Sequence, residues 1–234
     1  MKILIYVLCH NQETKACAIK EYGDKEWAKI ICIETTVLLE NIMYDKWLLE
    51  HYEDWKDVDY VGTISWKASK KILLPDMHKL AHFLEHVPFD IIPFYMTNDK
   101  LIEQATHYHP KFKNLWLKWL TALDIDQKII LDDETPAFFS NYWITKPNLM
   151  LKYIDYFKTA KIVLETTQDI QDELWENANY NDTLSKDKCF QIFGKPYFPY
   201  HVFLYERLPC FFFWNINASL LKPQTFPWLY HNYV

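Results

Sequence analysis

The chain has 234 residues, of which 50% are hydrophobic and 18% are aromatic, so it can bury a sizeable core and is not expected to be disordered. Its three glycines, Gly23, Gly62 and Gly194, are too far apart to form a glycine-rich phosphate loop. This excludes the dinucleotide fingerprint and the P-loop. The net charge of −6 and the lack of a basic run argue against a protein that binds the nucleic-acid backbone.

The cysteines and apolar runs indicate the compartment. Five cysteines without a C-x-x-C spacing are typical of reduced thiols in a cytoplasmic protein. The apolar run Ile3–Cys9 lacks a small-residue cleavage site, and a buried first strand explains it better than a signal peptide. No other apolar run approaches the roughly 20 residues that span a bilayer. We therefore expect one cytoplasmic domain over residues 1–234, with no transmembrane segment.

Strands and helices are predicted to alternate along the first half of the chain. Asn11 is a suitable cap for a helix that ends at Gly23, and a continuous apolar run before it predicts a covered strand. The predicted strands are residues 3–9, 28–34 and 59–65. The predicted helices are residues 12–22, a helix from Thr35 or Thr36 to about Trp47, and a lysine-rich segment that Pro75 breaks and Pro88 ends.

The second half continues this alternation and then changes character. A strand is predicted at residues 89–95, and Pro93 confines its end to an edge of the sheet or to the exit from it. A further strand is predicted at residues 138–144, and helices at residues 112–123 and from Pro147 to about Glu165. The last fifty residues are rich in aromatics and proline, and we expect irregular structure there. The order predicts an α/β fold in which helices flank a central, mostly parallel sheet.

One histidine motif has the spacing of metal ligands. His82, Glu85 and His86 match the H-x-x-E-H pattern of inverted zinc proteases. On a helix, the four-residue spacing places both histidines on one face, as two zinc ligands require. A solvated helix face explains the same pattern, so a zinc hydrolase is kept as an alternative function.

Two groups of charged residues are further candidates. Asp132 and Asp133 offer the hard carboxylate oxygens that Mg²⁺ and Mn²⁺ prefer, although a solvated turn is the simpler explanation. Arg207 is the only arginine and stands beside Glu206 in an apolar stretch. Its planar guanidinium suits a carboxylate or a diphosphate, whereas a structural ion pair is the alternative.

The order of several short motifs resembles a family of glycosyltransferase-like proteins of capsule and cell-surface polysaccharide clusters and large DNA viruses. Residues 59–66, DYVGTISW, look like the family's D-Y-I-G-x-x-H-Y-R-R stretch, and residues 44–47 look like the aromatic helix before it. Residues 89–93, FDIIP, are similar to its Y-D-I-I-P strand. Residues 141–146, NYWITK, are similar to N-M-F-I-M-K, and residues 206–208 match a late E-R-L.

The resemblance implies a GT-A-type fold that transfers a sugar from a uridine- or guanosine-diphosphate donor to a glycan acceptor. The donor would lie at the carboxyl ends of the central strands, in agreement with the general rule for open α/β sheets. The implied donor-binding residues are His10, Asn11, Thr63, Ser65, Trp66, Lys67, Asn141 and Arg207. The cytoplasm would be that of the host if the chain is viral.

The resemblance also indicates which residues would hold a metal and take part in the reaction. The family's D-x-D position falls on residues 63–67, where this chain has no carboxylate. Either Asp132 and Asp133 supply the ligands for Mn²⁺ or Mg²⁺, or Lys67 offsets the diphosphate charge without a metal. Lys67 and Arg207 are the candidates for leaving-group stabilisation, and Asp133 and Glu206 for the catalytic base. A carbohydrate-binding protein without catalysis is the second alternative.

Overall fold

The computed structural model describes residues 1–33, 43–126, 129, 134–138, 141–180 and 185–230. The strands of this part are β1 (Ile3–Cys9), β2 (Ala28–Cys32), β3 (Tyr60–Ser65), β4 (Ile91–Pro93) and β5 (Trp143–Thr145). The longer helices are α1 (Gln12–Tyr22), α6 (Met77–His86), α7 (Leu101–Tyr108), α8 (Phe112–Ala122), α10 (Pro147–Thr166), α11 (Gln168–Leu174), α12 (Lys186–Phe193) and α13 (Tyr200–Asn215). The short helical segments are η1 (Met43–Trp47), α3 (Leu48–Glu50), α4 (Tyr52–Trp55), α5 (Ala68–Lys71), η2 (Pro223–Thr225) and η3 (Pro227–Leu229).

The five strands form one sheet in the order β2-β1-β3-β5-β4. β1 pairs in parallel with β2 and β3, whereas β5 is antiparallel to both β3 and β4. β4 therefore points the same way as β3, and only β5 runs against the rest. This confirms an α/β fold with a mostly parallel sheet. The chain moves from β1 to β2 on one side and then to β3 on the other, which makes the carboxyl ends of β1 and β3 a topological switch point.

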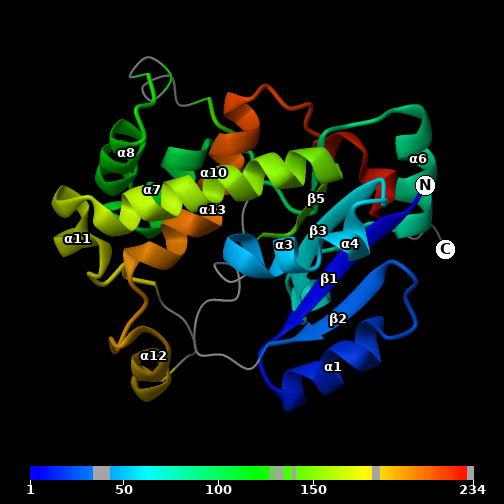
Figure 1. The fold of residues 1–234 in the computed structure, drawn as a ribbon, viewed down its shortest axis with the longest axis horizontal. Coiled ribbons are helices and arrows are strands. Elements are labelled where there is room, and N and C mark those ends of the chain that lie inside the picture. Colours follow the sequence, from blue (N-terminus) through cyan, green and yellow to red (C-terminus); the bar gives the residue numbers. More distant parts are fainter. Residues whose placement is uncertain (34–42, 127–128, 130–133, 139–140, 181–184, 231–234) are drawn as a thin grey trace.

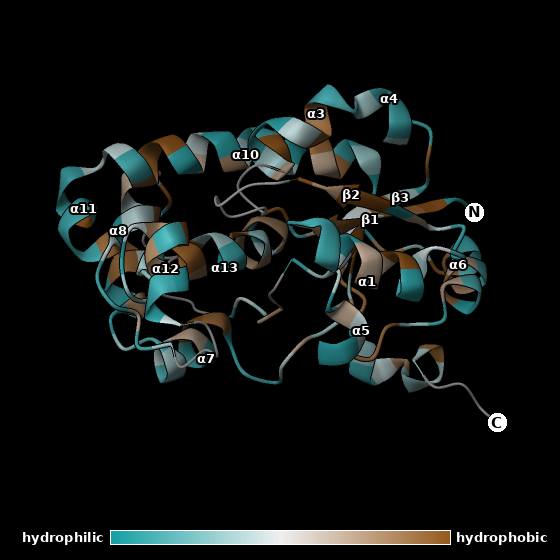
Figure 2. Ribbon diagram, turned by 90° about the horizontal axis from the view of Figure 1, so that it is seen from below, coloured by the Kyte–Doolittle hydropathy of each residue, from teal (hydrophilic) through white to brown (hydrophobic). Residues whose placement is uncertain are grey.

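Helices cover both faces of the sheet. Figure 2 shows α3, α4 and α10 over one face, and α1, α5 and α6 over the other. The alternation of side chains along β1 fits this arrangement, because Tyr6 and Leu8 belong to one core while Ile5 and Val7 belong to the other. The prediction that residues 3–9 form a covered strand is confirmed.

A second group of helices extends the molecule beyond the sheet (Figure 1), and it holds α7, α8, α11 and α13. Its core is strongly aromatic, and α13 alone buries most of its sixteen residues. The expectation of irregular structure in the last fifty residues is wrong for this segment. A helix that is apolar on nearly every side has no polar face, so no helical period is visible in its sequence.

Most other predicted helices and strands are confirmed, with their ends within a few residues of the predicted ones. α1 begins at Asn11, whose Oδ1 accepts a hydrogen bond from the backbone nitrogen of Thr14 at 2.8 Å, and it ends at Gly23. α10 has Pro147 in its first turn, and β4 is an edge strand. The strand predicted at residues 138–144 is shorter, Trp143–Thr145, and α7 is a helix that no prediction covers. Residues 34–42, which include most of the helix predicted from Thr35, lie outside the described part.

No helix in the described part of the chain is both long enough and apolar enough to span a membrane.

Candidate functional site

Several predicted donor-binding residues meet where β1 and β3 end. His10 and Asn11 follow β1, while Trp66 and Lys67 follow Ser65, the last residue of β3. We call these five residues the strand-end cluster. Because β1 and β3 are parallel neighbours at the switch point, the cluster occupies the place where open α/β sheets bind ligands.

The strand-end cluster combines aromatic rings with positive charge. The Nζ atoms of Lys67 and Lys70 lie 4.8 and 5.7 Å from the centroid of the Trp66 ring. The His10 ring is 6.4 Å from Trp66, and partial burial, followed by the charges of Lys67 and Lys188, lowers the pKa of His10. His10 is therefore neutral at pH 7, and the positive potential comes from the lysines. Such a surface suits an anionic ligand that also carries a flat ring.

Two of the predicted donor-binding residues use their side chains for hydrogen bonds within the protein. Thr63 is only 1% exposed, and its Oγ1 donates a hydrogen bond to the Asn141 carbonyl at 3.2 Å. The Oδ1 of Asn11 is used to cap α1. Thr63 thus positions the segment before β5, and the Asn11 side chain fixes the start of α1.

Asn141 is buried at the start of β5 in a left-handed backbone conformation, with φ 53°. Asparagine tolerates this conformation better than most residues. Its Oδ1 is buried, and no hydrogen-bond partner for it is found among the described residues. A buried acceptor of this kind usually has a partner, which makes Asn141 a group that a ligand or a water can satisfy.

A second feature at the same edge is a hollow of about 260 Å³, which we call the tyrosine hollow. Among the tyrosines that the structure describes, Tyr95, Tyr108 and Tyr180 are the exposed ones, at 42, 56 and 44%, and all three line it. Its polar lining includes Glu206 and Arg207. Exposed rings around a few polar groups are typical of sites for ligands with both apolar and hydroxylated faces.

Arg207 is 3% exposed and is held by the protein itself. Its Nε and Nη2 donate to Gln104 Oε1 at 3.3 and 3.1 Å, and its Nη1 donates to the Phe203 carbonyl at 3.2 Å. Nη1 also lies 3.5 Å from Glu206 Oε2, so the two predicted residues are ion-paired. Arg207 therefore fixes the orientation of the Glu206 carboxylate at the wall of the hollow.

His109 adds a neutral polar group to this wall. Burial, partly opposed by a hydrogen bond to the Ala178 carbonyl at 2.9 Å, lowers the pKa of His109 to about 4, so the ring is uncharged at pH 7. It stacks on Phe203 with ring centroids 3.8 Å apart. Sequence reasoning missed the three tyrosines, because they come from separate segments and have no common local pattern.

The strand-end cluster and the tyrosine hollow are connected through β5. Ser65 Oγ lies 2.6 Å from the hydroxyl of Tyr142, and the Tyr142 carbonyl accepts a hydrogen bond from the Phe94 nitrogen at 2.8 Å. Tyr95, the next residue, lines the hollow. Because β3 and β4 end at the same edge of the sheet, the two features are neighbours along this edge.

The residues at the end of β3 do not fit a divalent metal. Mg²⁺ and Mn²⁺ require hard oxygen ligands, usually carboxylates, whereas Ser65, Trp66 and Lys67 offer a hydroxyl, an indole and an ammonium group. Asp132 and Asp133 lie outside the described residues. His82, Glu85 and His86 are exposed on α6, and none of them lines the tyrosine hollow.

Comparisons with known proteins give little direct guidance. No family model matches the chain, and no curated protein matches it. Among solved structures, the chain is similar to the apo structure of the WbbM bifunctional glycosyltransferase, with a TM-score of 0.49 and 11% identity. The match covers 95% of this chain and 44% of that protein, so the chain spans less than half of its length. A likeness this distant leaves function to be argued from the chain's own residues.

Proposed function

We propose that the chain is a glycosyltransferase that moves a sugar from a nucleotide-diphosphate donor to a glycan acceptor. The observation that carries the proposal is the pairing of two unlike sites at one edge of the sheet. One is cationic and aromatic, as a nucleotide diphosphate requires, and the other is a tyrosine-lined hollow with a carboxylate, as a sugar requires. The motif order described above supports the same assignment.

In this proposal the strand-end cluster binds the donor. Trp66 stacks on the base or the ribose, while the Lys67 ammonium group offsets the charge of the diphosphate. His10 is neutral and contributes a hydrogen bond instead of charge. Uridine and guanosine diphosphates are the donor classes that the resemblance implies.

The tyrosine hollow then binds the acceptor glycan. Its exposed rings pack against the apolar faces of sugars, and Glu206 accepts the proton of the attacking hydroxyl. As the acceptor oxygen bonds to the anomeric carbon, the bond from that carbon to the donor diphosphate breaks. The electron pair leaves with the diphosphate, and the Lys67 ammonium group stabilises the negative charge that develops on it.

Donor binding is tested first by thermal shift and calorimetry with uridine- and guanosine-diphosphate sugars, with and without Mn²⁺. We expect binding without metal, and Lys67→Met should weaken it about tenfold or more because an ammonium contact to the diphosphate is lost. Lys25→Met is the matched control, since Lys25 is exposed in the turn before β2, away from the carboxyl ends of the strands. If no nucleotide binds, the transferase assignment is wrong.

Catalysis is tested by Glu206→Gln, which should abolish transfer while leaving donor affinity within about twofold. Arg207→Lys should lower transfer as well, because lysine cannot hold Gln104 and the Phe203 carbonyl together. Binding of free glycans without any nucleotide binding would instead favour the alternative, a carbohydrate-binding protein without catalysis. Loss of glycan binding in Tyr108→Ala would then place that glycan in the tyrosine hollow.

A further inference from the structure

The exposed face of α6 carries a group of potential metal ligands. His82, Glu85 and His86 each offer a ligand atom, and these atoms lie within 4.8 Å of one another. The helix has a clear inner face of Met77, Leu80 and Leu84, which pack in the core, so the two histidines and Glu85 all face solvent. The helical backbone fixes their spacing at three and four residues.

The side chains are close to the arrangement that a metal needs. Two ligands of a tetrahedral zinc ion lie about 3.3 Å apart when each metal–ligand distance is about 2.0–2.1 Å. The His82 and His86 rings already meet edge to face with centroids 5.0 Å apart, and His82 Nδ1 is 3.7 Å from Glu85 Oε2. The His82 side chain is 79% exposed, so packing does not hinder the rotations that would bring the three ligand atoms onto one ion.

Hydrogen bonds hold the side chains of His86 and Glu85 in orientations that suit metal binding. His86 Nδ1 lies 3.0 Å from the His82 carbonyl, which can only accept, so Nδ1 carries the proton and the lone pair is on Nε2. Metal-binding histidines usually have their second nitrogen held in this way by a carbonyl or a carboxylate. Glu85 Oε1 accepts a hydrogen bond from the Met1 amino group at 2.8 Å, which leaves Oε2 on the side of His82.

We propose that His82, Glu85 and His86 form a surface site for a divalent transition metal of the zinc class. Two imidazoles and one carboxylate are ligands that Zn²⁺ accepts, and water would complete the coordination. The site lies beside the amino end of β1, because Met77 and His78 of α6 line a hollow together with Met1 and Ile3. The strand-end cluster lies at the opposite end of β1, so the metal stabilises α6 and takes no part in transfer.

The test is calorimetric titration of the untagged full chain with ZnCl₂ at pH 7.5, followed by thermal unfolding with and without zinc. We expect one zinc per chain and a rise in Tm of a few degrees. His82→Gln and His86→Gln should each weaken zinc binding at least about tenfold and remove the rise in Tm. His107→Gln is the matched control, since His107 is an exposed histidine near the end of α7 and should leave both unchanged.

Cysteines are the competing ligands, so Co²⁺ is used as a spectroscopic probe. Burial raises the pKa of Cys9 to about 11, which disfavours its thiolate. We expect a Co²⁺ spectrum with ligand-field bands and without a thiolate charge-transfer band. The proposal is overturned if zinc does not bind, if thiolate bands dominate the spectrum, or if the double variant His82→Gln/His86→Gln binds zinc as the unchanged chain does. Each of these outcomes leaves the proposed transfer activity unaffected.

Discussion

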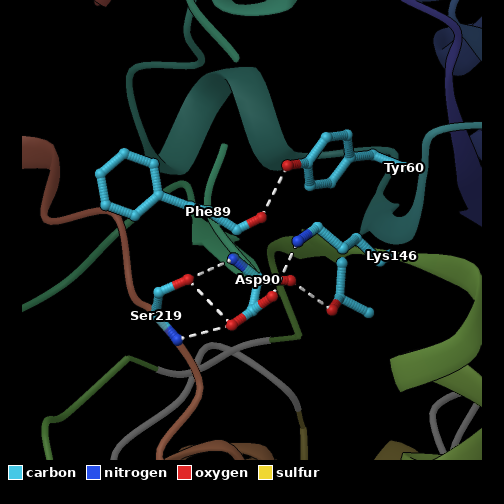
Figure 3. A network of polar contacts seen from close by, with 6 residues as sticks. Tyr60, Phe89, Asp90, Lys146 and Ser219 are labelled. Atoms are coloured by element: carbon cyan, nitrogen blue, oxygen red, sulfur yellow. Dashed lines mark hydrogen bonds and ion pairs between the residues drawn. The ribbon is translucent and has the colours of Figure 1, made fainter. Parts of the chain in front are cut away.

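Asp90 joins three separate parts of the chain at the outer edge of the sheet (Figure 3). Its Oδ1 accepts a hydrogen bond from Lys146 Nζ at 2.8 Å, and its Oδ2 accepts bonds from the backbone nitrogen and the hydroxyl of Ser219, both at 2.9 Å. The Asp90 carbonyl also accepts a hydrogen bond from Thr145 Oγ1 at 2.6 Å. This carboxylate therefore ties the start of β4 to the end of β5 and to the segment that follows α13.

Substitution of Asp90 by asparagine keeps the shape and removes the charge. The new amide oxygen can still accept from Ser219, but its NH₂ group faces the Lys146 ammonium, donor against donor. A hydrogen bond to a charged group contributes about 1.5–3 kcal/mol when it is well shielded. The Lys146 and Asp90 side chains are 36 and 30% exposed, so solvent screening reduces the value for this pair. We expect Asp90→Asn to cost about 2 kcal/mol, which for a chain of this size is a fall in Tm of about 4–8 °C.

The assay is denaturant unfolding of a double-mutant cycle with Lys146→Met. If the ion pair is responsible for the effect, the coupling free energy between the two substitutions should be about 1 kcal/mol. The reason is that removing one partner already breaks the ion pair, so removing the second partner costs less. A loss below about 0.5 kcal/mol for Asp90→Asn, or purely additive effects, would refute this account of the network.

The same network predicts a pH dependence. Burial alone would raise the pKa of Asp90, but the hydrogen bonds from Lys146 and Ser219 outweigh it, and the pKa is lowered from its ordinary value. A lowered carboxyl pKa gives stability that is present above the unfolded value of about 3.9 and is lost as the pH falls through the folded value. The difference between the unchanged chain and Asp90→Asn should therefore shrink below about pH 4.

The remaining predictions concern the centre of the sheet and the tyrosine hollow. Gly62→Ala should prevent normal folding or cost about 3 kcal/mol or more, because the added Cβ would lie 2.0 Å from the Trp143 carbonyl oxygen; expression and denaturant unfolding measure this. A near-neutral result would mean that β3 and β5 are not paired as described. His109 has a folded pKa of about 4, below its unfolded value of about 6.5, so up to about 3 kcal/mol of stability should be lost as the pH falls from 6.5 to 4. His109→Phe should remove this acid dependence, and an unchanged pH profile in that variant would count against a buried neutral histidine.

The sequence was most informative where the physical signal is local. The apolar run of β1, the Asn11 cap of α1 and the first-turn proline of α10 each depend on neighbours within a few positions, and the structure confirms all three. Pro93 indicated an edge strand because proline lacks the N–H that a central strand needs.

The sequence was least informative where tertiary packing, and not the alternation of polar and apolar residues, decides which side chains are buried. α13 is a helix with Pro209 inside it, and the uniform burial of its aromatic side chains hides the helical period. The tyrosine hollow is another such case. Tyr95, Tyr108 and Tyr180 are three of sixteen tyrosines, and only the folded chain separates the exposed ones from those in the core.

Gly62 determines how closely β5 can approach β3, and with it the positions of the strand-end cluster and the tyrosine hollow. A glycine inside a strand often marks a place where another backbone approaches closely. Here that neighbour is the backbone of β5, which pairs antiparallel with β3 at Gly62 and Ile144. That close approach brings the residues just before β5 to the end of β3, where Tyr142 meets Ser65. The same strand then carries β4 on its far side, with Tyr95 just beyond it. A side chain at position 62 would therefore disturb the strand-end cluster and the tyrosine hollow together, because both depend on the close pairing of β3 and β5.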